Sequence, residues 1–167
     1  APGQYEARCR ILRGNETVAE RTLPYEKQPL PEWYGNTIGV LDTAPKPFTP
    51  VRRDDDTVRC WGREYRYSGK LLPAQITTQN AEMLAGPIEL VLTTAAGKQH
   101  RSTDVEVQTK WGRHTDFRID FERTTHLGDT LVQASSWLEC DGFLWTTLRL
   151  SSVPVDVAKL VVRVPIK

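Results

Sequence analysis

Hydrophobic and polar residues alternate with a period of two along most of the chain, which is the pattern of a strand with one buried face. In 117–122 apolar and charged residues alternate without exception, so this strand has one wet face. Residues 57–67 are expected as one long strand or as two short ones broken at Gly62. Further strands are expected at 5–12, 17–23, 88–94, 105–109, 130–140, 143–151 and 158–166.

Helical periodicity is scarce. The best candidate for a helix is 78–85, which is long enough for one or two turns only. A chain of 167 residues fits one domain. The pattern therefore predicts an all-β fold, an antiparallel two-sheet β-sandwich or part of a supersandwich, with at most one short helix.

The stretch WLECDGFLWTTLRL at 137–150 predicts a tight hairpin. Asp-Gly tolerates the two positive φ angles of a type I′ turn, so Asp141 and Gly142 are expected as the two loop residues. Cys140 then lies opposite Phe143, and both faces of the hairpin are substantially apolar. Such a hairpin is either a central piece of a sandwich or has one face covered by something outside this chain.

Residues 24–50 depart from the strand rhythm, because they hold six of the eleven prolines. Proline fixes φ and donates to no ladder, so we expect extended, irregular chain. The segment also carries Trp33 and other apolar residues. We therefore expect 29–50 to be ordered against the sandwich, with Trp33 at least half buried and the WGREYRY strand at 61–67 as neighbour. On this interpretation 1–167 is a single domain, with 24–50 packed on it.

The charge balance and the lengths of the apolar runs argue against two classes of partner, nucleic acids and membranes. The formal net charge is +1, from 22 basic and 21 acidic residues without long single-sign blocks, so nucleic-acid binding is not expected. No apolar run approaches the roughly 20 residues of a membrane span. The chain begins APGQ, without an initiator Met or signal-peptide features, so either a signal peptide has been removed or the chain was cut from something longer.

No metal site or cofactor is predicted. The three histidines lack zinc-motif spacing and are expected at the surface: His100, His114 and His126. Asp54 to Asp56 lack the pattern of a calcium loop and are interpreted as a solvated turn before a strand. The three cysteines fit no metal site or disulfide framework and are interpreted as buried small hydrophobes, although one pair could bridge in an oxidising compartment: Cys9, Cys60 and Cys140.

Two features raise the possibility of carbohydrate chemistry. Glu139 and Asp141 would have to face each other about 5 to 10 Å apart to act as a glycosidase pair, but Asp141 already has a role in the turn. Five tryptophans are many for this length. An exposed indole stacks on sugar rings, whereas most tryptophans of a sandwich lie in the core or in a domain contact.

Four stretches carry a resemblance to a known family: PEWYGNTIGVLDTAPKPFTPVRR at 31–53, VRCWGREYRY at 58–67, LLPAQITTQNAEMLAGPIEL at 71–90, and LECDGFLWTTLRL with the terminal LVVRVPIK. The chain from 31 to 167 resembles the N-terminal β-sandwich of bacterial glycoside-hydrolase-like proteins of uncharacterised activity. Those proteins are similar to glycoside hydrolase family 123, the N-acetyl-β-galactosaminidase type. The resemblance implies a secreted or periplasmic protein whose catalytic Asp-Glu pair lies in a later (β/α)-barrel, with a non-catalytic sandwich before it.

Two functional hypotheses follow. The first is a non-catalytic module that supports or packs against a downstream catalytic domain of the same polypeptide. The alternative is an autonomous carbohydrate-binding module that holds a glycan on exposed tryptophans. The candidate ligand or interdomain contacts are Trp33, Trp61, Arg63 and Trp145, with Asp141 and Gly142 as structural turn residues. No residue is assigned to catalysis, and the chain alone is not expected to be an enzyme.

Overall fold

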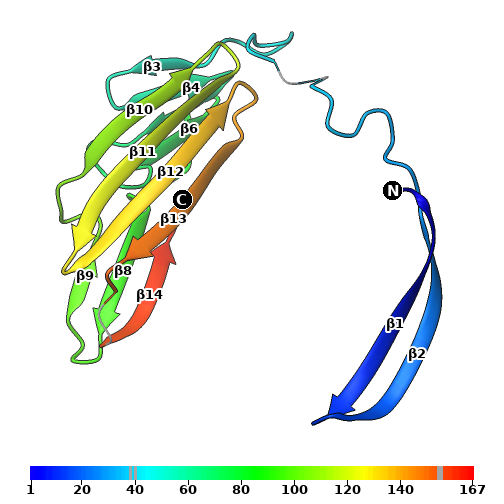
Figure 1. Cartoon of the computed structure of the whole chain (residues 1–167). Helices are drawn as coiled ribbons and strands as arrows, with labels where there is room; N and C mark the ends of the chain where they lie inside the picture. Colours follow the sequence, from blue (N-terminus) through cyan, green and yellow to red (C-terminus); the bar gives the residue numbers. More distant parts are fainter. Residues whose placement is uncertain (38, 40, 154–155) are drawn as a thin grey trace. The chain divides into compact units, whose positions relative to one another are not determined.

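The computed structural model describes residues 1–37, 39, 41–153 and 156–167, and the chain divides into two compact units, 1–40 and 41–167. Every described element is a strand and every ladder is antiparallel, which confirms the predicted all-β class (Figure 1). The described part of the chain contains no helix, and so none that is long and apolar enough to cross a membrane.

The first unit is a long hairpin of β1 (Gly3–Arg13) and β2 (Glu16–Lys27), which confirms the two strands expected at 5–12 and 17–23. Cross-strand partners share a face, so Tyr5 and its partner Tyr25 lie on one side of the ribbon. The same side carries the pairs Ala7–Leu23 and Ile11–Ala19. Every residue of both strands is exposed.

The front layer of the second unit is a four-stranded meander in which each strand pairs with its sequence neighbour. Its strands are β10 (Gln108–His114), β11 (Arg118–Leu127), β12 (Thr130–Glu139) and β13 (Leu144–Ser151). Along β11 and β12 buried residues alternate with partly exposed ones. The alternation read from the sequence is thus the division between the core face and the outer face of this sheet.

Two smaller sheets form the second layer (Figure 1). One runs in chain order through β3 (Arg52–Asp54), β4 (Thr57–Cys60), β5 (Arg63–Arg66), β6 (Gln75–Thr78) and β7 (Ala81–Glu82). The other has the order β14-β8-β9, from β8 (Glu89–Thr94), β9 (Gln99–Arg101) and β14 (Val157–Arg163). Each packs against part of the front sheet, so the core has two clusters.

The first cluster joins β4 and β5 to β11 and β12, with Tyr67 against Phe121 at 5.4 Å between ring centroids. The second cluster joins β8 to the far ends of the same front strands, with Leu90, Leu92 and Val132 at its centre. The largest fully buried side chain is charged: Arg123 on β11.

Arg123 is held by groups from the second layer. Its guanidinium forms an ion pair with Asp56, donates a hydrogen bond to the Lys70 carbonyl and lies 4.3 Å from the centroid of the Tyr67 ring. Burial lowers the pKa of Arg123 to about 10, which leaves it protonated at neutral pH. Asp56 also accepts a hydrogen bond from the Gly69 amide. The interpretation of Asp54 to Asp56 as a merely solvated turn is therefore wrong for Asp56, which anchors a buried charge.

The prediction of a short helix over 78–85 is wrong. Residues 75–78 and 81–82 are strands joined by a two-residue turn, in which Gln79 and Asn80 have positive φ angles of 47° and 67°. The apolar residues that suggested one or two helical turns serve other purposes. Leu84 enters the core, and a Gln75 side chain caps its backbone amide at 3.0 Å.

The hairpin at 137–150 is present, but its predicted register is wrong by one residue. Trp137 pairs with Trp145, and the Glu139 amide donates to the Phe143 carbonyl at 3.1 Å. The loop therefore has three residues, 140–142, closed by a bond of 2.9 Å from the Gly142 amide to the Glu139 carbonyl. Of these three only Gly142 has a positive φ, 88°, which suits a type I turn followed by a bulge.

The proline-rich segment behaves in two ways. In its second half, Phe48 contacts the first core cluster and meets the Trp61 ring edge-on, at 5.4 Å between centroids. Trp33 belongs to the first unit and exposes 69% of its surface, so the expected half-burial is wrong. The single domain expected over 1–167 stays a prediction.

Candidate functional site

The outer face of the front sheet carries a groove. Because side chains alternate along a strand, Arg118, Asp120 and Glu122 leave β11 on the face opposite to the core residues between them. The ladder aligns these residues with those of the neighbouring strands. Asp120 lies opposite Trp137, and Trp137 in turn lies opposite Trp145.

Two indoles line this groove, and the ring of Phe143 packs beside them. The indoles of Trp137 and Trp145 are nearly parallel, at 17°, with centroids 6.4 Å apart. Phe143 lies 6.4 Å from Trp145 and 5.3 Å from Trp137. Trp145 exposes 52% of its surface and Phe143 49%. The Trp145 indole N–H donates to the Thr147 hydroxyl at 3.1 Å, which fixes the orientation of the exposed ring.

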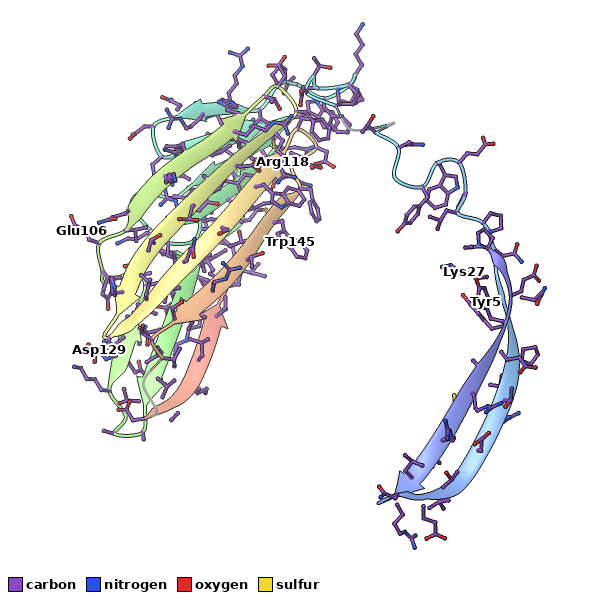
Figure 2. The ribbon with its side chains drawn as sticks, viewed as in Figure 1. Tyr5, Lys27, Glu106, Arg118, Asp129 and Trp145 are labelled. Atoms are coloured by element: carbon purple, nitrogen blue, oxygen red, sulfur yellow. The ribbon has the colours of Figure 1, made fainter. Side chains whose placement is uncertain are left out.

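Arg118 lies at the same end of the sheet as Trp145 (Figure 2). Its guanidinium carbon is 4.3 Å from the centroid of the Trp137 ring. Its Nε donates to the Asp120 carboxylate at 2.6 Å, and Nη1 is 3.8 Å from the Glu139 carboxylate. A ring on one side and two carboxylates on the other hold the guanidinium in place.

The groove has a volume of about 410 Å³. Beyond the two tryptophans its lining includes the charged residues Lys110, Arg118, Asp120 and Glu122, so the charges balance. Glu122 accepts a hydrogen bond from the Gln133 amide and is the cross-strand partner of Lys110. A flat apolar wall thus stands beside several fixed hydrogen-bonding groups.

Comparison with protein families decides the membership of the chain. The model described as "Glycoside hydrolase 123, third domain" matches residues 51–167, which is more than half of the chain. The chain belongs to this family. Neither the comparison with curated proteins nor the comparison with solved structures finds a match.

The match confirms the resemblance to glycoside hydrolase family 123 and covers the whole strand-rich second unit except its first ten residues. A family described as a third domain belongs to polypeptides that have other domains. That description gives no support to the expected N-terminal position of the sandwich, which stays a prediction together with the bacterial origin.

In a glycoside hydrolase 123 domain the first question is whether the groove carboxylates could catalyse. Asp120 and Glu122 are two residues apart on one strand, so their side chains leave the same face and their Cα atoms lie roughly 7 Å apart. Both carboxylates already act as hydrogen-bond acceptors, Asp120 from the Arg118 guanidinium and Glu122 from the Gln133 side-chain amide. The pair is therefore placed to accept hydrogen bonds.

Glu139 differs from these two carboxylates. Burial raises the pKa of the Glu139 carboxyl, the nearby Asp141 raises it further, and Arg118 opposes the rise. Glu139 is not among the residues that line the groove. The carboxylate pair Glu139 and Asp141, considered from the sequence, is therefore split between the sheet face and the tip of the hairpin loop.

The structure separates the four contact residues predicted from the sequence. Trp145 lines the groove, Trp61 and Arg63 lie near Asp141 in a smaller hollow, and Trp33 belongs to the first unit. Sequence reasoning missed the partners of Trp145, namely Trp137 and the charged residues of β11. The alternation in 117–122 predicted that those charged residues lie on the exposed face of a strand. Only the correct hairpin register places Trp137 beside Trp145.

Proposed function

We propose that this chain is a non-catalytic module of a multidomain glycoside hydrolase 123 protein, and that the groove on the outer sheet face binds a saccharide chain. The observation that carries the proposal is the pair of nearly parallel indoles, Trp137 and Trp145, beside fixed charged hydrogen-bonding groups. Family membership supports a setting in which saccharides are the substrates.

The chemistry of a sugar suits both features of the groove, the flat indole faces and the charged hydrogen-bonding groups. A pyranose ring presents C–H bonds on its flat faces and hydroxyl groups around its edge. The exposed Trp145 face can cover the C–H side, as aromatic rings combine an apolar body with a specific geometry. Asp120 and Glu122 are acceptors and Lys110 is a donor for the hydroxyl groups at the edge. The balance of charge favours a neutral saccharide.

A dry contact with another domain suits the groove less well. The centre of a protein interface is depleted in charged residues, and each buried charge must be paired. Four charged side chains line this groove, and Lys110 makes no ion pair among the described residues. A hydrated, polar ligand leaves these groups partly in water, so their desolvation costs less.

Affinity gel electrophoresis on neutral and sulfated polysaccharides tests the proposal with the full chain. We expect retardation by at least one neutral polysaccharide. Trp145→Ala should weaken it about tenfold, because covering ~60 Å² of apolar surface contributes ~1.5 kcal/mol. Trp33→Ala is the matched control, since it removes an even more exposed indole from the other unit.

Three outcomes would contradict the proposal. The first is equal retardation of Trp145→Ala and the parent chain. The second is binding to sulfated polymers alone, which would refute the argument from charge balance. The third is release of reducing ends that disappears in Asp120→Asn or Glu122→Gln, which would make the groove an active site.

A separate surface favours the second role expected from the sequence, packing against another domain of the same polypeptide. The terminal strand β14 is an edge strand, and large apolar side chains on it and just after it are exposed: Leu160, Val162, Val164 and Ile166. We propose that a neighbouring domain covers them. Amide exchange in β14 should then be slower in the natural multidomain polypeptide than in this chain, and equal exchange would contradict the packing role.

A further inference from the structure

A second hollow lies at the end of the sandwich where three turns meet. The β4–β5 turn contributes Trp61 and Gly62, the β6–β7 turn contributes Gln79, and the β12–β13 loop contributes Asp141. Its volume is about 130 Å³, the space of about four water molecules. It shares no lining residue with the groove of the outer sheet face.

Hydrogen bonds fix the walls of this hollow. The Gln79 amide donates to the Gly62 carbonyl at 2.8 Å and so ties two of the turns together. Arg63 Nη1 donates to the Gly142 carbonyl at 3.1 Å, and the Tyr65 hydroxyl donates to the same oxygen at 2.7 Å. These bonds tie the third loop to β5. The walls are therefore formed before any ligand arrives, which lowers the entropy lost on binding.

Gly142 shows how closely this loop approaches β5. A Cβ atom at Gly142 would lie 2.8 Å from both Cδ and Nη1 of Arg63, and its φ of 88° already disfavours other residues. The loop thus needs glycine in order to let the guanidinium pass beneath it. Arg63 thus both holds the loop through Nη1 and belongs to the lining of the hollow.

The lining combines one aromatic ring with donors and acceptors. Trp61 exposes 51% of its surface, and the edge-on contact with Phe48 fixes its indole. Asp141 Oδ1 accepts the Phe143 amide at 2.8 Å, so its second oxygen faces no bonding partner among the described residues. Arg63 supplies donors, while Gln79 and Thr78 supply an amide and a hydroxyl.

We propose that this hollow, the loop-end site, binds a single pyranose residue such as the terminal residue of a glycan. The volume is too small for a chain, one exposed indole suits one C–H face, and the opposite charges of Arg63 and Asp141 suit hydroxyl groups. The site rests on residues other than those of the groove. It therefore stands or falls independently of the proposed function.

The five tryptophans make a direct test available. Each indole N–H gives one cross-peak in a ¹H–¹⁵N spectrum of the full chain, and Trp→Phe variants assign the peaks. We expect the Trp61 peak to shift saturably on addition of at least one of the methyl glycosides of glucose, galactose, N-acetylglucosamine and N-acetylgalactosamine. A dissociation constant near the millimolar range fits one small ligand.

Variants locate the effect. Trp61→Ala removes its own indole peak, so here the backbone amide peaks of Gly62 and Gln79 report binding, and they should no longer shift. Trp145→Ala and Trp33→Ala should leave the Trp61 shift unchanged. Gln79→Gly removes a lining side chain without straining the turn, because glycine adopts a φ of 47° freely, and it should weaken binding several-fold with the fold intact. The proposal is overturned if none of the four glycosides moves the Trp61 peak. It is also overturned if Gln79→Gly binds as the parent does, or if the Gly62 and Gln79 amide peaks still shift with a glycoside in Trp61→Ala.

Discussion

Asp56→Asn tests the buried ion pair that joins the two layers of the sandwich. Asparagine keeps an oxygen for the Gly69 amide but removes the negative charge beside Arg123. Arg123 exposes 0% of its surface, so the substitution leaves a buried charge without its counter-charge. Breaking a buried pair from one side costs roughly 3–5 kcal/mol.

The lower end of that range applies here. The Asp56 side chain is 24% exposed, so water reaches this end of the ion pair and lowers the cost of leaving Arg123 without its counter-charge. We therefore expect a loss of about 3 kcal/mol in the free energy of unfolding. For a domain of this size that corresponds to a fall in Tm of roughly 10 °C. Urea unfolding at pH 7 followed by tryptophan fluorescence measures the change.

The same turn supplies the control. Asp54→Asn makes the identical chemical change in an exposed pair with Arg59, where water screens the interaction, so the midpoint should stay within error. Arg123→Met removes the buried charge itself. Adding Asp56→Asn to Arg123→Met should then cost little, because the partner charge is already gone. Equal costs for Asp54→Asn and Asp56→Asn would refute the argument from burial.

Two further predictions concern the core and the loop end. Gly142→Ala should lower the free energy of unfolding by about 2 kcal/mol, because alanine disfavours the positive φ and its Cβ displaces Arg63. Gly97→Ala is the control: Gly97 has a similar φ but lies in open space, so the loss should be only about 1 kcal/mol. Equal losses in urea unfolding would contradict the Arg63 contact. Burial raises the pKa of Cys60 to about 11, above the 9.0 of the unfolded thiol. Its contribution is therefore present below pH 9 and is lost as the pH rises, by roughly 1 kcal/mol between pH 8 and 10. Cys60→Ala should lose correspondingly less stability over this interval.

The strands were predictable because period-two alternation reflects burial directly. The residues of β11 and β12 alternate in the sequence as they do between core and surface. The β6–β7 turn was not predictable, because Gln79 has little intrinsic preference for its positive φ. Tertiary pairing with Gly62 imposes that conformation.

The candidate site depended on a single register. Asp-Gly is compatible both with a two-residue type I′ loop and with a three-residue loop that needs one positive φ, and local sequence does not choose between them. Contacts distant in sequence favour the second, since the Cys140 amide donates to the Phe117 carbonyl at 2.8 Å and Arg63 holds Gly142. A shift by one residue changes which side chains are neighbours. For that reason the pairing of Trp137 with Trp145 could not be predicted from the sequence.

The groove is built on strands, and this separates its chemistry from the stability of the domain. Each groove residue of β11 lies between two core residues but points away from them, so substituting Asp120 or Glu122 leaves the packing of Ile119 and Phe121 untouched. Substitutions on such a face usually change stability by less than about 0.5 kcal/mol. Selection or design can therefore alter the ligand preference of this surface residue by residue, without rebuilding a loop and without drawing on the stability of the core.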